Sequence, residues 1–144
     1  MSVTRIPAAL RRQVVERAYQ SCEYCLLPAA VAFFAHEVDH VVAEKHGGTT
    51  EEANLAFTCW RCNRHKGTDL GSFDPDTGAF SLLFTPRAQQ WRDHFALREG
   101  IIRGLTPEGR TTIRLLQINT EERVRERLRL VASGSYPPSG IEIR

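Results

Sequence analysis

Two stretches decide the fold: CEYC at residues 22–25 and HEVDHVVAEKHGGTTEEANLAFTCWRCNRHKG at residues 36–67. They contain two C-x-x-C pairs, an adjacent Asp39-His40 pair at the end of an apolar run, and a Gly-Gly break after it. Residue types that bind metal ions and transfer protons are concentrated here. We therefore expect the functional site to lie between the two cysteine pairs.

The second stretch has the pattern of strand, loop, strand and helix. Residues 31–42 are rich in Val, Phe and Ala, which favours a strand that ends near the Asp-His pair. Thr49 followed by Glu52 resembles a capping box and predicts a short helical turn. Leu55 to Thr58 is a second predicted strand. The helix that follows begins at the second cysteine pair and is expected to end at a glycine.

Composition and length favour one folded domain. The chain has 144 residues, 42% hydrophobic and 25% charged, which are ordinary values for a globular protein. No apolar run is long enough to span a membrane, and the N-terminus lacks a signal-peptide pattern, so a cytoplasmic protein is expected. The net charge of +2 is too small to indicate nucleic-acid binding by itself.

The expected organisation is a single domain over residues 1–132, followed by a flexible tail over 133–144. Within the domain, residues 22–70 form the core, 1–21 an N-terminal helix and 71–132 a C-terminal extension. Hydrophobic periodicity and turn signals predict the flanking elements: a helix over 7–20, a strand over 80–84, a hairpin of 94–97 with 101–105, a helix from Thr106-Pro107, and a last helix capped by Asn119 with Glu122 and bearing Val124, Leu128 and Val131.

The four cysteines are predicted to bind one structural zinc ion. In a reducing compartment disulfides are disfavoured, and two matched C-x-x-C pairs are typical of tetrahedral zinc sites. Four thiolates fill the coordination sphere and leave no position for water, so the ion fastens the fold. The ligands are Cys22, Cys25, Cys59 and Cys62.

The Asp39-His40 pair suggests metal-assisted hydrolysis. A neutral histidine can take a proton from water, and a carboxylate beside it can hold a hard divalent cation. Adjacent residues on a regular strand point to opposite faces, so the two side chains can address one substrate only where the strand twists or ends. An Asp-His pair alone is weak support, because an exposed pair without function is the simpler interpretation.

With its flanks, the segment Cys22 to Gly67 resembles the HNH endonuclease family: a C-x-x-C, a DH pair, a Gly-Gly loop, an Asn before the second C-x-x-C, and C-N-x-x-K. The resemblance implies an α+β fold with a ββα-metal core. It implies His40 as general base, Asp39 and Asn63 as ligands of a catalytic Mg²⁺ or Mn²⁺, and Asn54 as the brace of the loop. The third letter of the family motif falls on Asn63, an accepted variant.

Four basic residues of the predicted helix are candidates for phosphate contacts, with ordinary solvated positions as the alternative: Arg61, Arg64, His65 and Lys66. Glu37 and Glu44 are interpreted as spectators. The basic cluster from Arg123 to Arg129 reads first as a solvated helix face.

The function expected from the sequence is therefore hydrolysis of DNA phosphodiesters, with RNA as an open alternative substrate. One rival is a zinc-stabilised module that binds nucleic acid without cutting it. Another is a zinc-organised protein-interaction domain. Sequence specificity, cleavage mode, biological role and oligomeric state are left open by the residues.

Overall fold

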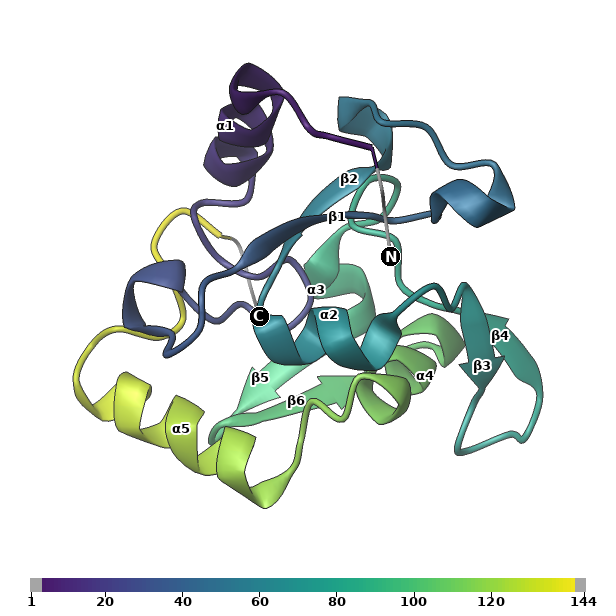
Figure 1. The fold of residues 1–144 in the computed structure, drawn as a ribbon. Helices are drawn as coiled ribbons and strands as arrows, with labels where there is room; N and C mark the ends of the chain where they lie inside the picture. The colour runs from purple at the N-terminus through teal and green to yellow at the C-terminus, as the bar shows by residue number, and fades with distance from the viewer. Residues whose placement is uncertain (1–3, 142–144) are drawn as a thin grey trace.

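The computed structural model describes residues 4–141, which fold into an α+β arrangement of α-helices and two-stranded antiparallel sheets (Figure 1). This confirms the expected fold class. None of the described helices is long and apolar enough to cross a lipid bilayer.

The predicted core motif is formed by β1 (Glu37–His40), β2 (Leu55–Thr58) and α2 (Trp60–Lys66). The two strands are antiparallel, with Asp39 opposite Ala56 and His40 opposite Leu55. Two short 3-10 turns, Glu44–His46 and Glu52–Asn54, lie in the loop between them. The strand, loop, strand and helix order is as the sequence pattern indicates.

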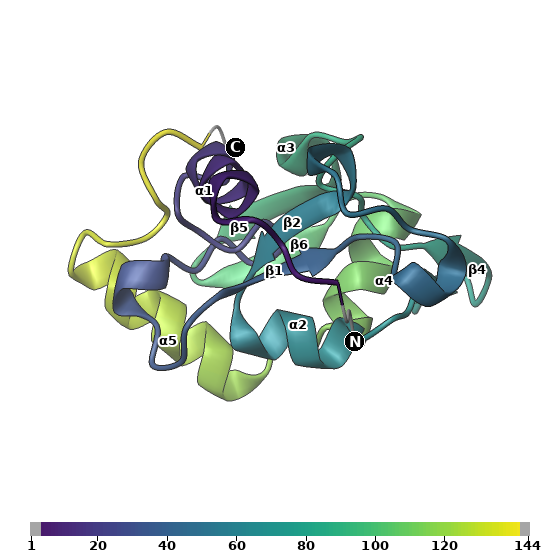
Figure 2. The ribbon, with the colours of Figure 1, turned by 45° about the horizontal axis from the view of Figure 1, so that its top comes forward.

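Helix α1 (Ala8–Arg17) lies on the opposite side of this strand pair from α2 (Figure 2). Its N-cap position is Pro7, whose fixed φ suits a helix start. The apolar side of α1 packs on the strands in a small cluster: Val14, Ala18, Val38, Leu55 and Phe57. The strand pair thus lies between α1 and α2, and the face of β1 that carries Glu37 and Asp39 is turned toward α2.

The C-terminal extension consists of two hairpins and three helices. Its elements are β3 (Gly71–Phe73), β4 (Phe80–Leu82), α3 (Trp91–His94), β5 (Phe95–Arg98), β6 (Ile101–Gly104), α4 (Pro107–Leu115) and α5 (Glu121–Ala132). The expected hairpin is β5–β6, turning at Glu99 and Gly100, which both have positive φ. Thr106 caps α4 by accepting from the Gly109 N–H. β3 and α3 were not predicted from the sequence.

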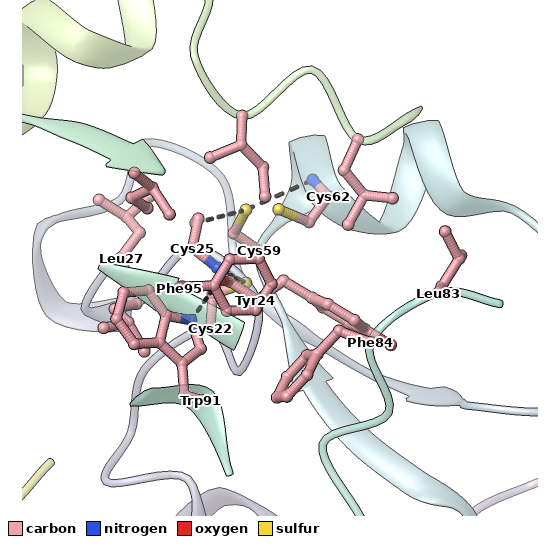
Figure 3. Packing of buried hydrophobic residues seen from close by; sticks show 14 of the residues in the cluster. Cys22, Tyr24, Cys25, Leu27, Cys59, Cys62, Leu83, Phe84, Trp91 and Phe95 are labelled. Atoms are coloured by element: carbon pink, nitrogen blue, oxygen red, sulfur yellow. Dashed lines mark hydrogen bonds between the residues drawn. The ribbon is translucent and has the colours of Figure 1, made fainter. Parts of the chain in front are cut away.

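The larger hydrophobic cluster surrounds the cysteines and joins the core motif to the extension (Figure 3). Tyr24 and Phe84 pack edge to face, and Phe95 lies against both Phe84 and Trp91. The Trp91 indole N–H donates to the Tyr24 carbonyl at 2.9 Å. The polar atom of this buried aromatic residue is therefore satisfied, as a buried indole requires.

Two predicted caps differ from the structure. The N-cap of α5 is Thr120, whose hydroxyl accepts from the Arg123 N–H. Asn119 instead bonds the backbone of Ile102 in β6 through both side-chain atoms. The side chain of Thr49 bonds Glu51 and caps no helix. Asn119 therefore bonds a residue that is distant in sequence, and Thr49 bonds a near neighbour, instead of capping a helix.

Two residues of the segment expected to be a flexible tail, Tyr136 and Ile141, pack against the core. Tyr136 is buried, and its hydroxyl donates to the Cys25 carbonyl at 2.7 Å. Ile141 also contacts the larger cluster. The ring of Tyr136 supplies the apolar area for this contact. The small and polar residues beside it in sequence give no indication that the segment packs on the core. Residues 142–144 lie outside the described part of the chain.

Candidate metal centres and active site

The four cysteine sulfurs converge on one buried point. Their Sγ atoms all lie within 4.8 Å of one another, and Cys25 and Cys59 approach to 3.7 Å. One pair comes from the turn after α1 and the other from the start of α2 (Figure 3). Cys22 and Cys62 are fully buried. Four converging thiol groups fit a tetrahedral zinc ion by donor chemistry and by proximity.

Burial and mutual hydrogen bonds shift the pKa values of these thiols. Burial raises the pKa of the Cys22 thiol well above its ordinary value, and burial likewise raises the pKa of Cys62. Hydrogen bonds from the other three thiols lower the pKa of Cys25. Without a metal the cluster therefore holds protons on some sulfurs, whereas zinc replaces them.

Arg123 brings a positive charge from α5 to the sulfurs. Its Nη2 donates to the Sγ of Cys62 at 3.1 Å, and its Nη1 donates to the Leu116 carbonyl at 2.9 Å. Burial lowers the pKa of Arg123, but the charges of the three nearest cysteines and the hydrogen bond to Cys62 together raise it above its ordinary value. A tetrathiolate zinc centre carries a net negative charge, which this guanidinium offsets.

The position of Arg123 corrects the interpretation of the basic cluster as a solvated face. Arg123 and Arg127 are 4% and 2% exposed, whereas Leu128 and Val131, apolar residues of the same helix, are 44% and 45% exposed. Arg127 donates to the Gly100 carbonyl at 2.6 Å. Hydrophobic periodicity points to the wrong face, because it treats arginine as exposed. The one local signal that Arg123 and Arg127 share a face of the helix is their i, i+4 spacing.

The second site lies where β1 faces α2. Glu37 and Asp39 are two residues apart on β1, so their side chains share a face. From α2, the Asn63 Nδ2 donates to Glu37 Oε2. This hydrogen bond orients the amide and leaves Oδ1 as the atom for a cation. Glu37, interpreted from the sequence as a spectator, contacts Asn63, and its i, i+2 spacing from Asp39 places both on one face of β1.

Lys66 does not lie where a phosphate contact was expected. It is 2% exposed, and its Nζ lies 3.4 Å from Asp39 Oδ2 and 3.1 Å from the His40 carbonyl. The ammonium is held between two oxygens because its aliphatic stem is buried beneath α2. Lys66 is thus an internal counter-charge for Asp39, with its ammonium bonded inside the protein.

His40 is the last residue of β1, and its side chain points away from the face that carries Asp39. The ring is 2% exposed, and its Nε2 lies 2.8 Å from the Thr50 hydroxyl. Among the described residues no group bonds Nδ1, which is buried. A buried ring nitrogen without a partner is costly, so a water or ligand at this atom would be stabilising.

Asn54 ties the loop to the end of β1. Its Nδ2 donates to the carbonyls of Val42 and Thr49, and its Oδ1 accepts from the Val42 N–H, each at 2.9 Å. Gly48 is required beside it, because an added Cβ would lie 1.7 Å from the Val42 oxygen. These contacts hold the loop that carries Thr50, the partner of the His40 ring.

The remaining basic candidates differ in their surroundings. Arg61 is bound to Glu122 and Glu126 of α5, at 2.6 Å and 3.2 Å. Arg64 and His65 are exposed, and Arg64 lies over the Trp60 ring with its Cζ 5.2 Å from the centroid. Partial burial lowers the pKa of His65, and the charges of Arg123 and Arg64 lower it further.

Comparison with known proteins agrees with this geometry. Residues 22–69 match the family model described as HNH endonuclease, about a third of the chain. No curated protein and no solved structure matches the chain. The matched segment spans both cysteine pairs, the two strands and α2, and it confirms the resemblance recognised in the sequence. Residues 22–69 of this chain are therefore similar to the HNH endonuclease family.

Proposed function

We propose that the protein is a metal-dependent endonuclease that hydrolyses DNA phosphodiester bonds, with His40 as general base. The family match supports a nuclease-type function in general. The observation that carries the finer proposal is the contact of Asn63 in α2 with Glu37, on the face of β1 that also carries Asp39. Carboxylate and amide oxygens are the ligands that Mg²⁺ and Mn²⁺ prefer.

Asp39 and Asn63 would hold the divalent ion. Such an ion, when bound, polarises the phosphoryl oxygen and stabilises charge on the leaving oxygen. Lys66 contacts Oδ2 of Asp39, which leaves Oδ1 available. Glu37 fixes the rotation of the Asn63 amide. Each ligand is thus oriented by a partner before the ion arrives, which reduces the cost of binding it.

His40 would remove the proton from the attacking water. When its Nε2–H donates to the Thr50 hydroxyl, the lone pair resides on Nδ1, the nitrogen without a partner. His40 ends β1, so its ring lies at the point where strand geometry gives way to the loop that Asn54 holds. The zinc centre fastens this motif and takes no part in the chemistry.

A binding module that does not cut is the second candidate, and one contact favours it. The Lys66 ammonium next to Asp39 already supplies a positive charge where the cation is expected. In this alternative Asp39 and Lys66 form a structural pair, and no divalent ion binds.

The test is incubation of purified zinc-loaded protein with supercoiled plasmid, with Mg²⁺, with Mn²⁺ or without added divalent ion. The proposal expects nicked or linear products only with the added ions. A parallel Mn²⁺ titration followed by electron paramagnetic resonance should show binding that Asn63→Ala and Glu37→Gln weaken. The exposed Glu121→Gln serves as the matched control. Intact plasmid together with no Mn²⁺ binding would favour the binding module.

A further inference from the structure

Three aromatic side chains form an exposed cluster outside the candidate active site. Phe33 is 92% exposed, Phe34 51% and Trp60 37%. The rings touch: the Phe33 and Phe34 centroids are 4.9 Å apart, and those of Phe34 and Trp60 are 4.8 Å apart. Single exposed apolar residues need no explanation, but a contiguous exposed group usually marks a binding surface.

These rings form one wall of a cleft of about 370 Å³ between α2, α5 and the segment that precedes β1. The remaining apolar lining includes Leu27 and Ala32. The volume is within the range of small-molecule pockets, and a mainly apolar lining suits a flat aromatic group. Phe34 and Trp60 are inclined by only 32°. They offer neighbouring ring faces of similar orientation.

The charges around the cleft are asymmetric. On the α5 side, Arg61 is paired with Glu122 and Glu126. On the α2 side, Arg64 lies over the Trp60 ring, and no ion pair with a carboxylate is formed by it among residues 4–141. The unneutralised positive charge therefore lies at the α2 edge, where an anionic backbone would pass.

The cluster is adjacent to the candidate active site through α2. Trp60 and Arg64 are four residues apart and share a face of the helix, and Asn63 lies between them in sequence. At about 1.5 Å of rise per residue, Asn63 is within about 5 Å of either along the helix axis. A nucleic-acid backbone at Asn63 would bring its neighbouring nucleotide within reach of the rings.

We propose that the cleft at Phe33, Phe34 and Trp60 binds an unpaired nucleobase, and that the substrate is DNA with a single-stranded segment next to the cleaved bond. This inference rests on the proposed function. Aromatic side chains stack on bases whose faces are free, and in a continuous duplex both faces are already stacked. Arg64 holds the adjoining phosphate, which a purely apolar protein partner would not need.

The test uses Trp60 as a built-in probe. The chain has two tryptophans, and the other, Trp91, is 8% exposed with its indole N–H bonded internally. Wild-type protein without added divalent ion is titrated with a single-stranded DNA oligonucleotide and with its duplex, following tryptophan fluorescence and anisotropy of labelled DNA. Quenching by the single strand at concentrations where the duplex gives none is expected. Trp60→Phe should abolish the quenching.

The double variant Phe33→Ala/Phe34→Ala should weaken single-strand binding about 5- to 100-fold, the usual range for losing base stacking. The matched control is Phe73→Ala/Phe80→Ala, which removes another exposed pair, 61% and 62% exposed with centroids 5.7 Å apart. Its affinity should stay at the wild-type value. Zinc content and circular dichroism establish that both variants are folded.

The inference is overturned if the aromatic variant binds the single strand as wild type does, or if duplex and single strand quench equally. A changed sedimentation coefficient of that variant with unchanged DNA affinity would identify a protein interface and overturn it too. The proposed function fails separately: if neither plasmid nor a duplex with a single-stranded gap is cleaved with any ion while the single-strand quenching persists, the nuclease is excluded and base binding in the cleft is supported.

Discussion

At the scale of single residues, polar side chains act in pairs that fix one another. Thr50 orients the His40 ring, Glu37 orients the Asn63 amide, and Lys66 contacts Asp39. Each pair leaves one atom of the functional group available. Preorganisation of this kind means that a substitution acts on chemistry and on the neighbour's orientation together, so tests need a readout of each.

His40→Gln is expected to lower plasmid cleavage about 10²- to 10⁴-fold, the usual contribution of a general base. Glutamine retains most of the buried volume and can bond the Thr50 hydroxyl, but it cannot accept the proton. Rates from gel assays with Mg²⁺ check this. Zinc content and thermal stability should remain close to wild type, and unchanged cleavage would contradict the role.

At the scale of elements, α5 is joined to the core motif by a buried charge. Arg123 reaches the cysteine sulfurs, and Arg61 of α2 is paired with carboxylates of α5. The β3–β4 hairpin is joined to α4 similarly: Asp74 accepts two hydrogen bonds from Arg110, at 2.7 Å and 3.0 Å. The extension is therefore fastened by arginines as well as by apolar contact.

Arg123→Met should weaken zinc binding about 10- to 100-fold, the usual cost of losing an outer partner of a metal site. Methionine fills much of the volume but provides neither charge nor N–H groups. Competition with a chromogenic chelator measures the change. Arg125→Met is the control, since Arg125 is exposed on the same helix. Equal zinc affinity in the two variants would show that the guanidinium is unimportant for the metal.

Asp74 should make the fold acid-sensitive below about pH 4. The hydrogen bonds from Arg110 lower the pKa of Asp74 well below its ordinary value. A carboxylate with a depressed folded-state pKa stabilises the fold above its unfolded pKa, about 3.9, and loses this contribution as the pH falls further. The Tm difference between wild type and Asp74→Asn should be constant above pH 5 and shrink below pH 4. A pH-independent difference would exclude this linkage.

At the scale of the whole molecule, the cysteine site is the junction of the fold. Its ligands come from the turn before β1 and from the start of α2, and the larger hydrophobic cluster is built around them. The C-terminal segment also reaches it through the Tyr136 hydroxyl. A chain of this size buries a modest core, so a metal cross-link at this site would contribute a large share of its stability.

Native protein should contain one zinc per chain, and removing it should unfold the core motif and the extension together. Four buried thiols without the ion remain partly protonated, and the folded arrangement loses the bonds that close it. Elemental analysis and thermal melts before and after a thiol-competing chelator provide the measurement. Cys59→Ser should behave as the metal-free protein does. A cooperative melt retained without zinc would contradict the prediction.

The sequence alone determined the features that short spacings encode. Two C-x-x-C pairs predict convergent thiols, Leu55 to Thr58 is a strand with the bounds that its pattern predicts, and Gly67 ends α2 with φ of 52°. These follow from local backbone preferences and from ligand chemistry. The turn at Glu99-Gly100 is also predicted from the sequence. Both of its residues have positive φ, a conformation that glycine adopts readily.

Only the tertiary structure decided which distant polar groups meet. Arg123 bonds Cys62 across 61 positions, Lys66 bonds Asp39 across 27, and Asn119 serves β6 instead of capping a helix. Periodicity assigns charged residues to the surface, whereas a buried charge is stable wherever a partner of opposite charge is brought to it. That partner is supplied by the packing of α5 and α2 around the cysteine site, which no local pattern specifies.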